Sequence, residues 1–334
     1  MDFKGKKILI IGGTGTIGKS IVQAVMKDDP QVIKIFSRDE YKQYLLQNEL
    51  GNTDIVRFII GDIRDYDSLF SAMHNTDYVF HLAAMKHVDT CEYNPLEGVK
   101  TNVLGTNNVI KAAISQNVKK VVFTSSDKAN SPTNTYGATK LIAERLISSA
   151  QSDNEKGKTI FASVRFGNVM GSSGSVIPLF KEQVMKNKKI TLTDKNMTRF
   201  MMSLNQATQL TIKSMKEAKG GEVFVLKMPV IKLGDLVDII VEEMCEKYKI
   251  NNEEIDIEII GLRPGEKMYE ELMTYDESRE AWELPDMYVI PGKSNMEYIH
   301  SNAKKLNPGN YSSLSQEPLG INKVRALLED EKLI

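Results

Sequence analysis

The chain of 334 residues contains only two cysteines, Cys91 and Cys245, and they lie far apart in the sequence. Their separation offers no metal-ligand spacing, so we expect buried free thiols in a reducing compartment and no metal site. Long hydrophobic runs are also missing, because the first apolar run, residues 8–11, is too short for a signal-peptide core or a membrane span. These absences predict a cytoplasmic protein without a membrane partner.

An excess of charge of one sign is the third absence. Lysine and arginine number 43, aspartate and glutamate number 44, and the formal net charge is -1. This balance provides no electrostatic footprint for nucleic acid or an anionic membrane, so we expect neither as a partner. Hydrophobic residues at 41% and charged residues at 26% describe an ordinary globular protein. The length allows two or three domains, or one large domain with a smaller lobe.

Apolar runs that read as buried strands alternate with segments of helical periodicity. The strand-like runs are residues 8–11, 32–36, 55–60, 78–82, 121–123 and 160–164. The helical segments between them are residues 17–26, 96–114 and 139–149. This alternation predicts an α/β fold: a Rossmann-type doubly wound parallel sheet, with a smaller, mixed α/β lobe in the C-terminal part.

A glycine-rich loop follows the first predicted strand and opens the first predicted helix. Glycine permits a tight turn there and a close approach of the backbone to a pyrophosphate, which would sit on the helix N-terminus. The strand-turn-helix context makes a dinucleotide site the stronger interpretation, although an ordinary glycine-rich turn is the alternative. The candidate cofactor residues of this loop are Gly12, Thr14, Gly15, Thr16, Ile17 and Gly18.

The end of the second predicted strand distinguishes NADP from NAD. An acidic residue there would bind the adenosine 2′-hydroxyl, whereas a basic residue accommodates a 2′-phosphate. The chain has Ser37 and Arg38, which suit a phosphate, followed by Asp39, which favours NAD if the strand end shifts slightly. We therefore predict NADP in preference to NAD.

Residues after the third and fourth predicted strands are further candidates for cofactor contacts. Asp62 and Ile63 could offer an acceptor and an apolar surface to an adenine, although a plain surface loop explains Asp62 equally well. The small side chains of Ala83 and Ala84 let the backbone approach the cofactor.

Four titratable side chains cluster in one stretch after the fifth predicted strand. Tyr136 and Lys140 are four residues apart, so they share one face of a helix, and an ammonium near the phenol would lower the pKa of Tyr136. Asp127 and Lys128 form a second pair just upstream. Their presence beside a nucleotide-binding fold indicates more than one proton transfer per turnover. The alternative for Asp127 and Lys128 is a solvated ion pair at the end of a strand.

These motifs together resemble the extended short-chain dehydrogenase/reductase superfamily, from about residue 5 to about residue 290. The motifs are the glycine loop, His81-Leu82-Ala83-Ala84, Tyr136-x-x-x-Lys140 and Arg165-Phe166-Gly167-Asn168-Val169. Further stretches resemble the UDP-N-acetylglucosamine 4,6-dehydratases of bacterial surface-sugar pathways, and most closely the branch without transmembrane helices. They are Ala84-Met85-Lys86-His87-Val88, Glu92-Tyr93-Asn94-Pro95-Leu96-Glu97, Lys100-Thr101-Asn102, Ser126-Asp127-Lys128-Ala129, Met197-Thr198-Arg199-Phe200 and Leu262-Arg263-Pro264-Gly265-Glu266-Lys267.

The resemblance implies a role for each catalytic candidate. Tyr136, aided by Lys140, would take the proton of the sugar 4-hydroxyl while NADP+ accepts hydride from C4. Lys128, if burial keeps it neutral, would remove the C5 proton, and Asp127 would protonate the departing 6-hydroxyl. Ser126, or the neighbouring Ser125, would hydrogen-bond the 4-oxygen in place of the threonine more usual in the family.

The resemblance also implies contacts to UDP-N-acetylglucosamine and, because relatives commonly assemble, a homo-oligomer. Asn168, Ser175 and Val176 would contact the nucleotide end, and Arg199 and Arg263 would bind the diphosphate. Glu266 would accept from the ribose hydroxyls or orient Arg263, and Lys86 would lie in the region between nicotinamide and sugar. For the two arginines, surface salt bridges are the alternative.

Three functions remain open from the sequence. The first is the 4,6-dehydratase, with a slight preference for inversion at C5. The second is a UDP-hexose C4 epimerase, which would have no need of Asp127 and Lys128. The third is a non-catalytic NADP-binding regulator. In each case we predict an NADP-binding Rossmann domain over residues 1–170, to which about 200–235 return, and mainly a nucleotide-sugar-binding lobe over residues 171–334.

Overall fold

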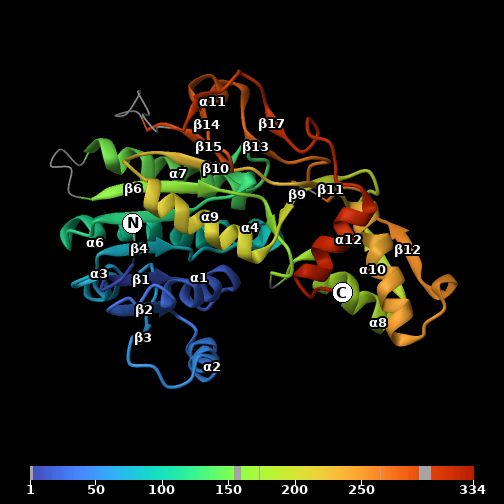
Figure 1. Cartoon of the computed structure of the whole chain (residues 1–334), viewed down its shortest axis with the longest axis horizontal. Coiled ribbons are helices and arrows are strands. Elements are labelled where there is room, and N and C mark those ends of the chain that lie inside the picture. Colours follow the sequence, from blue (N-terminus) through green and yellow to red (C-terminus); the bar gives the residue numbers. More distant parts are fainter. Residues whose placement is uncertain (1–2, 154–158, 173, 264, 293–301) are drawn as a thin grey trace.

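The computed structural model describes residues 3–153, 159–172, 174–263, 265–292 and 302–334. Within these residues the main sheet has ten strands, seven of them parallel in the order β3-β2-β1-β4-β5-β6-β10 (Figure 1). The parallel strands are β1 (Lys7–Ile11), β2 (Val32–Ser37), β3 (Val56–Ile60), β4 (Tyr78–His81), β5 (Lys120–Thr124), β6 (Ile160–Arg165) and β10 (Val223–Leu226). Antiparallel strands β15 (Met287–Ile290), β14 (Trp282–Glu283) and β16 (Lys304–Lys305) extend the sheet beyond β10. The predicted doubly wound parallel sheet is confirmed.

Helices cover both faces of this sheet because successive residues of its strands point to opposite sides. Ile8 and Ile10 of β1 belong to one buried core, and Leu9 and Ile11 to the other. The first core includes side chains of α1 (Thr16–Met26), α2 (Glu40–Leu50) and α9 (Leu204–Glu217). The second includes side chains of α3 (Tyr66–Met73), α6 (Gly105–Ser115) and α7 (Thr135–Asp153).

The helix predicted over 96–114 is confirmed, but its middle is π-helical. The chain forms α4 (Val88–Tyr93), α5 (Pro95–Gly98) and a π-helical segment, η1 (Val99–Leu104), before α6 begins. Buried Asn102 lies in η1, where its side chain exchanges hydrogen bonds with the backbone of Met85 and donates to Thr139 Oγ1. A π-bulge widens a helix locally, which is how Asn102 is presented to partners 17 and 37 residues away.

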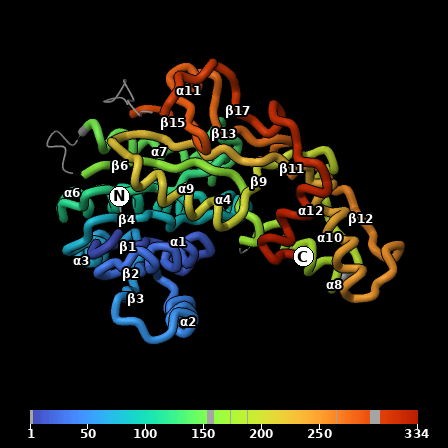
Figure 2. The backbone as a smooth tube through the Cα atoms, viewed as in Figure 1, coloured from blue at the N-terminus to red at the C-terminus, as the bar shows by residue number. Residues whose placement is uncertain are grey.

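A separate lobe, at the right of Figure 1, has its own hydrophobic core. It contains α8 (Val176–Asn187), α10 (Leu233–Tyr248), α12 (Ile321–Asp330), the short η3 (Asn252–Glu254) and the parallel pair β8 (Lys189–Leu192) and β12 (Asp256–Ile259). The small sheet β7 (Asn168–Val169), β9 (Thr198–Met202) and β11 (Val230–Lys232) adjoins this lobe. Figure 2 shows the carboxy terminus ending in the lobe.

The chain after residue 170 contributes to both parts. The helix α9 and strand β10 return to the main sheet, and so does the later segment from β14 to β15. The antiparallel pair β13 (Glu271–Met273) and β17 (Tyr311–Ser312), with α11 (Tyr275–Glu280), lies near the top of the view. The division of the chain into two domains at residue 170 stays a prediction.

A fully buried arginine fastens this later segment to the sheet. Arg165 of β6 makes ion pairs with Glu144 of α7, at 2.5 Å, and with Glu277 of α11, at 2.9 Å, and donates to the Leu272 carbonyl. Burial lowers the pKa of Arg165, but the two carboxylates raise it further, so the guanidinium stays charged.

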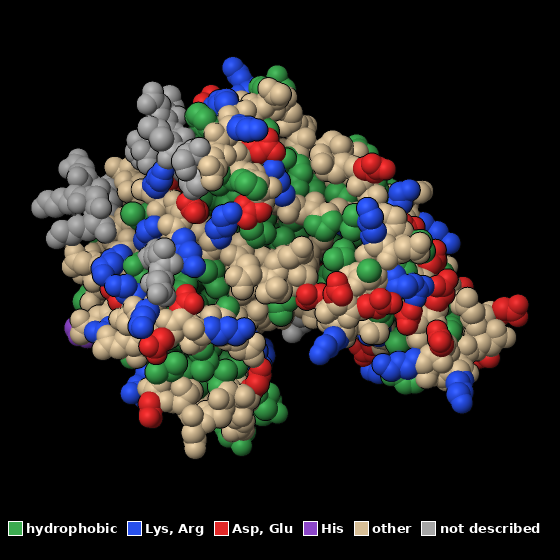
Figure 3. Space-filling view, in the orientation of Figure 1, with side chains coloured by type: hydrophobic (Ala, Val, Ile, Leu, Met, Phe, Trp, Pro, Cys, Tyr) green, Lys and Arg blue, Asp and Glu red, His purple; other side chains and the backbone are tan. Residues whose placement is uncertain are grey.

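On the surface, basic and acidic side chains are interspersed over the face shown in Figure 3. In the described part of the chain, every helix is too short or too polar to cross a bilayer.

Candidate active site

The carboxyl ends of the parallel strands open into a large cavity of about 1290 Å³. A second cavity of about 300 Å³ adjoins it, because Asp127, Lys128 and Asn168 line both. Loops at this edge of a doubly wound sheet are where such folds bind ligands. The large cavity reaches from the glycine loop to the start of α8, and the small one is lined by Arg263 and by six residues between 265 and 271.

The glycine loop has the shape that a dinucleotide requires. Gly12 has a φ of +82°, and a Cβ there would lie 2.8 Å from the backbone nitrogen of Ala83. A Cβ on Gly18 would lie 2.6 Å from Gly13 Cα, which fits close packing of the loop on α1. Gly15 precedes α1, whose N-terminus receives no side-chain cap. The uncapped N–H groups fit a bound pyrophosphate. All six predicted loop residues line the large cavity.

At the end of β2, Asp39 and Ser37 have structural partners, whereas Arg38 does not. The Asp39 carboxylate accepts from the Lys42 backbone N–H at the start of α2, and Ser37 Oγ accepts from Gln43. Arg38 is exposed, lines the large cavity and has no hydrogen bond or ion pair within the described residues. The guanidinium is therefore available to an anionic ligand.

The remaining cofactor candidates also lie around the large cavity: Asp62, Ile63, Ala83, Ala84 and Lys86. The Asp62 carboxylate is held by the Arg64 side chain, with 2.6 Å between Oδ2 and Nη2. Burial raises the pKa of Asp62, but the hydrogen bonds from Arg64 lower it further. Part of the hydrogen-bonding capacity of the Asp62 carboxylate is therefore used by Arg64.

Tyr136 and Lys140 begin α7 as predicted from their spacing, but the predicted effect of Lys140 on Tyr136 is wrong in the free protein. Lys140 Nζ donates to the Thr124 carbonyl at 2.6 Å and lies 4.2 Å from the centroid of the Phe123 ring. Burial lowers the pKa of Lys140 to about 7. Burial raises the pKa of Tyr136, and the opposing effects of Lys128 and of a hydrogen bond with Ser126 leave it above its usual value.

Ser126, Asp127 and Lys128 form a compact turn at the end of β5. Ser126 caps the short helix η2 (Asp127–Ala129), accepting from the Lys128 N–H, and donates to Asp127 Oδ1 at 2.7 Å. Lys128 Nζ lies 2.9 Å from Asp127 Oδ2. Asp127 is 4% exposed, whereas 32% of the Lys128 side chain is exposed, so the carboxylate of this pair is buried and its ammonium only partly so. Neighbouring Ser125 has a buried hydroxyl without a hydrogen-bond partner in the described structure.

The condition set for Lys128, that burial keeps it neutral, is not met in the free protein. Burial lowers the pKa of Lys128, but the carboxylates of Asp127 and Glu270 raise it well above its usual value. For Asp127, burial raises the pKa and Lys128 lowers it, with a net decrease. The two side chains therefore rest as an ammonium and a carboxylate.

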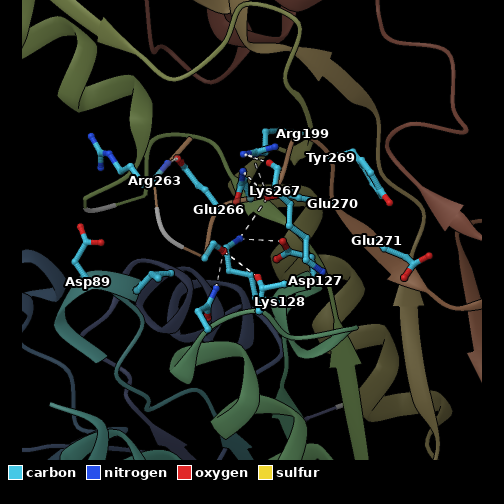
Figure 4. Close-up of a pocket in the computed structure, with 15 residues that line it drawn as sticks. Asp89, Asp127, Lys128, Arg199, Arg263, Glu266, Lys267, Tyr269, Glu270 and Glu271 are labelled. Atoms are coloured by element: carbon cyan, nitrogen blue, oxygen red, sulfur yellow. Dashed lines mark hydrogen bonds and ion pairs between the residues drawn. The ribbon is translucent and has the colours of Figure 1, made fainter. Parts of the chain in front are cut away.

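Glu270 is the functional candidate that sequence reasoning missed. It is 7% exposed, with Oε1 3.4 Å from Lys128 Nζ and 3.4 Å from Arg199 Nε. Burial and the charge of Asp127 raise the pKa of Glu270 to about 7. Figure 4 shows Glu270 directed toward Asp127 and Lys128, while its neighbour Glu271 points away. In the sequence, Glu270 and Glu271 stand side by side after the Gly265-Glu266-Lys267 motif. Two adjacent glutamates indicate a possible acidic site, but the sequence does not show which of the two carboxylates is buried.

The predicted substrate residues divide between the cavities. Ser175 and Val176 line the large cavity at the start of α8, and Asn168 lines both. Arg199, Arg263 and Glu266 line the small one.

The two arginines of the small cavity differ in what they can bind. Arg199 donates to the carbonyls of Thr198 and Lys267 and pairs with Glu270, so most of its donors are committed. Arg263 is exposed, and within the described residues its guanidinium has no partner. Glu266 accepts from the Arg263 backbone N–H at 3.1 Å. Of the two arginines, Arg263 is the one free to bind a diphosphate (Figure 4).

Metal ligands do not gather in this region: across the described ranges, no three His, Cys, Asp or Glu side chains are placed to hold an ion. The functional groups available for catalysis are hydroxyl, carboxyl and amino groups near the glycine loop.

Three proteins are similar in sequence over most of the chain. An uncharacterised membrane protein of Methanocaldococcus jannaschii is 47% identical over 94% of this chain and 96% of its own length. A UDP-N-acetylglucosamine 4,6-dehydratase (inverting) of Campylobacter jejuni is 40% identical, with 86% and 83% covered. A UDP-glucose 4-epimerase of Rickettsia rickettsii is 38% identical, with 98% and 96% covered. The dehydratase and the epimerase are thus similarly related to this chain.

Among solved structures, Pen from Bacillus thuringiensis is 59% identical, with a TM-score of 0.94 and full coverage of both chains. The dTDP-glucose 4,6-dehydratase DesIV from Streptomyces venezuelae, solved with NAD bound, is 20% identical with a TM-score of 0.69, covering 78% of this chain and 86% of its own. The latter shows a shared fold, one that holds a nicotinamide cofactor in DesIV. Residues 8–292 match the family model described as polysaccharide biosynthesis protein, so this chain belongs to that family, within the extended short-chain dehydrogenases/reductases that modify nucleotide sugars.

Proposed function

We propose that the protein catalyses the NADP-dependent 4,6-dehydration of UDP-N-acetylglucosamine to a UDP-4-keto-6-deoxy-hexosamine. The observation that carries the proposal is the Asp127–Lys128 pair, in which the carboxylate is buried and the ammonium half-buried, with 2.9 Å between Nζ and Oδ2. The pair lies at the boundary of the two cavities and next to Ser126. A dehydratase needs a base for the C5 proton and an acid for the 6-hydroxyl, and this pair supplies both groups.

Four side chains are each assigned a step of the reaction. Tyr136 takes the proton of the 4-hydroxyl, and Ser126, which bonds the phenol, holds the 4-oxygen. When bound, an oxidised nicotinamide supplies the hydride acceptor for C4, a positive charge that favours the Tyr136 phenolate, and later the hydride for C6. The ketone at C4 acidifies the C5 proton, which Lys128 removes, while Asp127 protonates the departing 6-hydroxyl.

Binding of the nucleotide sugar is proposed to use both cavities. Arg263 contacts the diphosphate, Glu266 positions Arg263 or the ribose, and Asn168 with the start of α8 meets the nucleotide end. Lys86, which lines the large cavity, is proposed to contact the region between nicotinamide and sugar.

Preference for NADP over NAD rests on Arg38. This exposed guanidinium is unpaired in the described structure, whereas Asp39 is engaged as the cap of α2. A free guanidinium suits the 2′-phosphate.

A UDP-hexose C4 epimerase is the second candidate, favoured by the 38% identity to the Rickettsia rickettsii epimerase over 98% of this chain. Epimerisation at C4 has no proton transfer at C5 or C6, so it leaves Asp127 and Lys128 without a role. A non-catalytic NADP-binding regulator would leave Tyr136 without a role as well. Cytoplasmic location and homo-oligomer formation stay predictions.

The test is incubation of the protein with NADP and UDP-N-acetylglucosamine, followed by mass spectrometry and NMR of the product. Loss of one water supports the dehydratase. An isomer of unchanged mass supports the epimerase, and unchanged substrate supports the regulator. Solvent deuterium at C5, read through NMR coupling constants, then tests the expected inversion.

A further inference from the structure

A third carboxyl group completes the cluster around Lys128. Glu270 precedes β13, and its backbone N–H donates to Ser313 Oγ at 2.9 Å. Its Oε2 accepts from the Phe200 N–H at 3.1 Å, and its Oε1 faces Lys128, Arg199 and Asn168. Elements on three sides thus hold the carboxyl in one position, with one oxygen turned to the Lys128 ammonium.

The charged groups facing Glu270 are Asp127 and Lys128 from η2 and Arg199 from β9. Lys128 Nζ lies 2.9 Å from Asp127 Oδ2 and 3.4 Å from Glu270 Oε1, so the two carboxyls flank one ammonium, and each carboxyl affects the pKa of the other. Lys128 contacts both, and 32% of its side-chain surface remains exposed, while the side chains of Asp127 and Glu270 are 3% and 7% exposed. A buried pair of carboxyls bridged by an ammonium can hold a shared, movable proton.

This arrangement answers a difficulty in the proposed function, on which the inference rests. Lys128 must lose a proton before it can act as a base, yet Asp127 alone is a poor acceptor because its pKa is lowered. Glu270, with its pKa raised to about 7, accepts the same proton at a smaller cost.

We propose that Glu270 is a positioning residue of the elimination step, which takes the proton of Lys128 and relays it through Asp127 to the departing 6-hydroxyl. The N–H bond at Lys128 Nζ breaks as an O–H bond forms at Glu270 Oε1. Glu270 passes its proton to Asp127, and Asp127 gives its proton to the 6-oxygen, which leaves as water. The amine of Lys128 takes the C5 proton, the C5–H electrons form the C5–C6 double bond, and all three side chains return to their initial charges.

The substitution Glu270→Gln separates this role from the rest of catalysis. Glutamine keeps a carbonyl for the Phe200 N–H but cannot accept a proton. Single-turnover absorbance of the reduced nicotinamide rises with C4 oxidation and falls after elimination. We expect the rise to persist and the fall to slow by about 100-fold, within the usual range for acid–base groups.

The pH dependence of the falling phase is the readout that a structural role would not move. In the wild-type protein its rate falls as pH drops below about 7, because protonated Glu270 cannot accept from Lys128. Glu270→Gln abolishes this pH dependence, and Glu270→Asp restores part of both rate and pH dependence. Lys140 also has a pKa of about 7, but it acts at C4, which the rising phase reports separately.

Glu222→Gln is the matched control, because Glu222 is another buried glutamate, bonded to the backbone N–H groups of Lys219 and Gly220 and lining neither cavity. It should leave both phases unchanged. The relay is contradicted if Glu270→Gln keeps the wild-type falling phase, or if it abolishes the rise as well. Should Glu270→Gln fail to fold, a pH-independent falling phase in the wild-type protein contradicts the relay equally. Absence of any water loss by the wild-type protein would instead refute the proposed function, independently of Glu270.

Discussion

Lys128 and Glu270 are separated by 142 positions in the chain, yet Lys128 Nζ lies 3.4 Å from Glu270 Oε1. The contact joins the turn after β5 to the segment that precedes β13 (Figure 4). The proposed acid–base chemistry therefore depends on two parts of the chain that meet only in the folded protein.

Removing the proposed C5 base should stop dehydration and spare C4 oxidation. Lys128→Ala removes the amine that takes the C5 proton, so we expect the rate of water loss to fall by at least about 100-fold. Formation of reduced nicotinamide on addition of UDP-N-acetylglucosamine should persist. Lys186→Ala, an exposed position paired with Glu182 on α8, serves as control. Full dehydration activity in Lys128→Ala would show that another group is the base.

Arg38→Ala should weaken the binding of NADP but not that of NAD. A charge-assisted hydrogen bond to phosphate contributes about 1.5–3 kcal/mol, which corresponds to a loss of affinity of roughly tenfold or more. Calorimetric titration of both cofactors with both proteins measures the difference. An equal loss for NAD and NADP would defeat the assignment of Arg38 to the 2′-phosphate.

Lys140 should make the stability of the protein depend on pH. Burial lowers its pKa from 10.5 to about 7, so between these values the unfolded chain binds more protons than the folded chain. The contribution of Lys140 to the free energy of unfolding therefore rises with pH across this window, by at most about 1.4 kcal/mol per pH unit. Urea unfolding at several pH values should show this slope in the wild-type protein and its loss in Lys140→Met. Parallel pH dependences for the two proteins would indicate that Lys140 has an ordinary pKa.

Arg165→Met should destabilise the protein far more than a matched change on the surface. It leaves the Glu144 carboxylate buried without its cation, and the loss from breaking a buried pair is about 3–5 kcal/mol. Arg325 of α12 also pairs with two glutamates, but on the surface of the lobe, so Arg325→Met should cost about 1 kcal/mol or less. Urea unfolding measures both, and similar losses would mean that the Arg165 network adds no special stability.

Local sequence patterns predicted the parts of the structure that local forces determine. The apolar run of β1, the glycines after it and the four-residue spacing of Tyr136 and Lys140 each depend on neighbouring residues, and each was placed correctly on a strand, a turn or a helix. The sequence also predicted that Arg38 lies at the end of β2. Only the structure showed that Asp39 caps α2, which leaves Arg38 as the side chain available to a ligand.

Features that depend on distant contacts were beyond the sequence. The π-helical segment exists where Asn102 bonds Met85 and Thr139, and the charge of Lys128 is set by Glu270 as well as by its neighbour Asp127. Periodicity cannot distinguish buried Glu270 from Glu271 beside it. Nor could spacing show that Lys140 donates to the Thr124 carbonyl, a contact that requires α7 to dock on β5.

The fate of the C4 hydrogen tests the central claim most directly. UDP-N-acetylglucosamine carrying deuterium at C4 is incubated with the protein and NADP, and the product is analysed by NMR and mass spectrometry. The account predicts a product that has lost one water, has a ketone at C4 and carries the deuterium at C6. Deuterium retained at C4, or a product of unchanged mass, would contradict it.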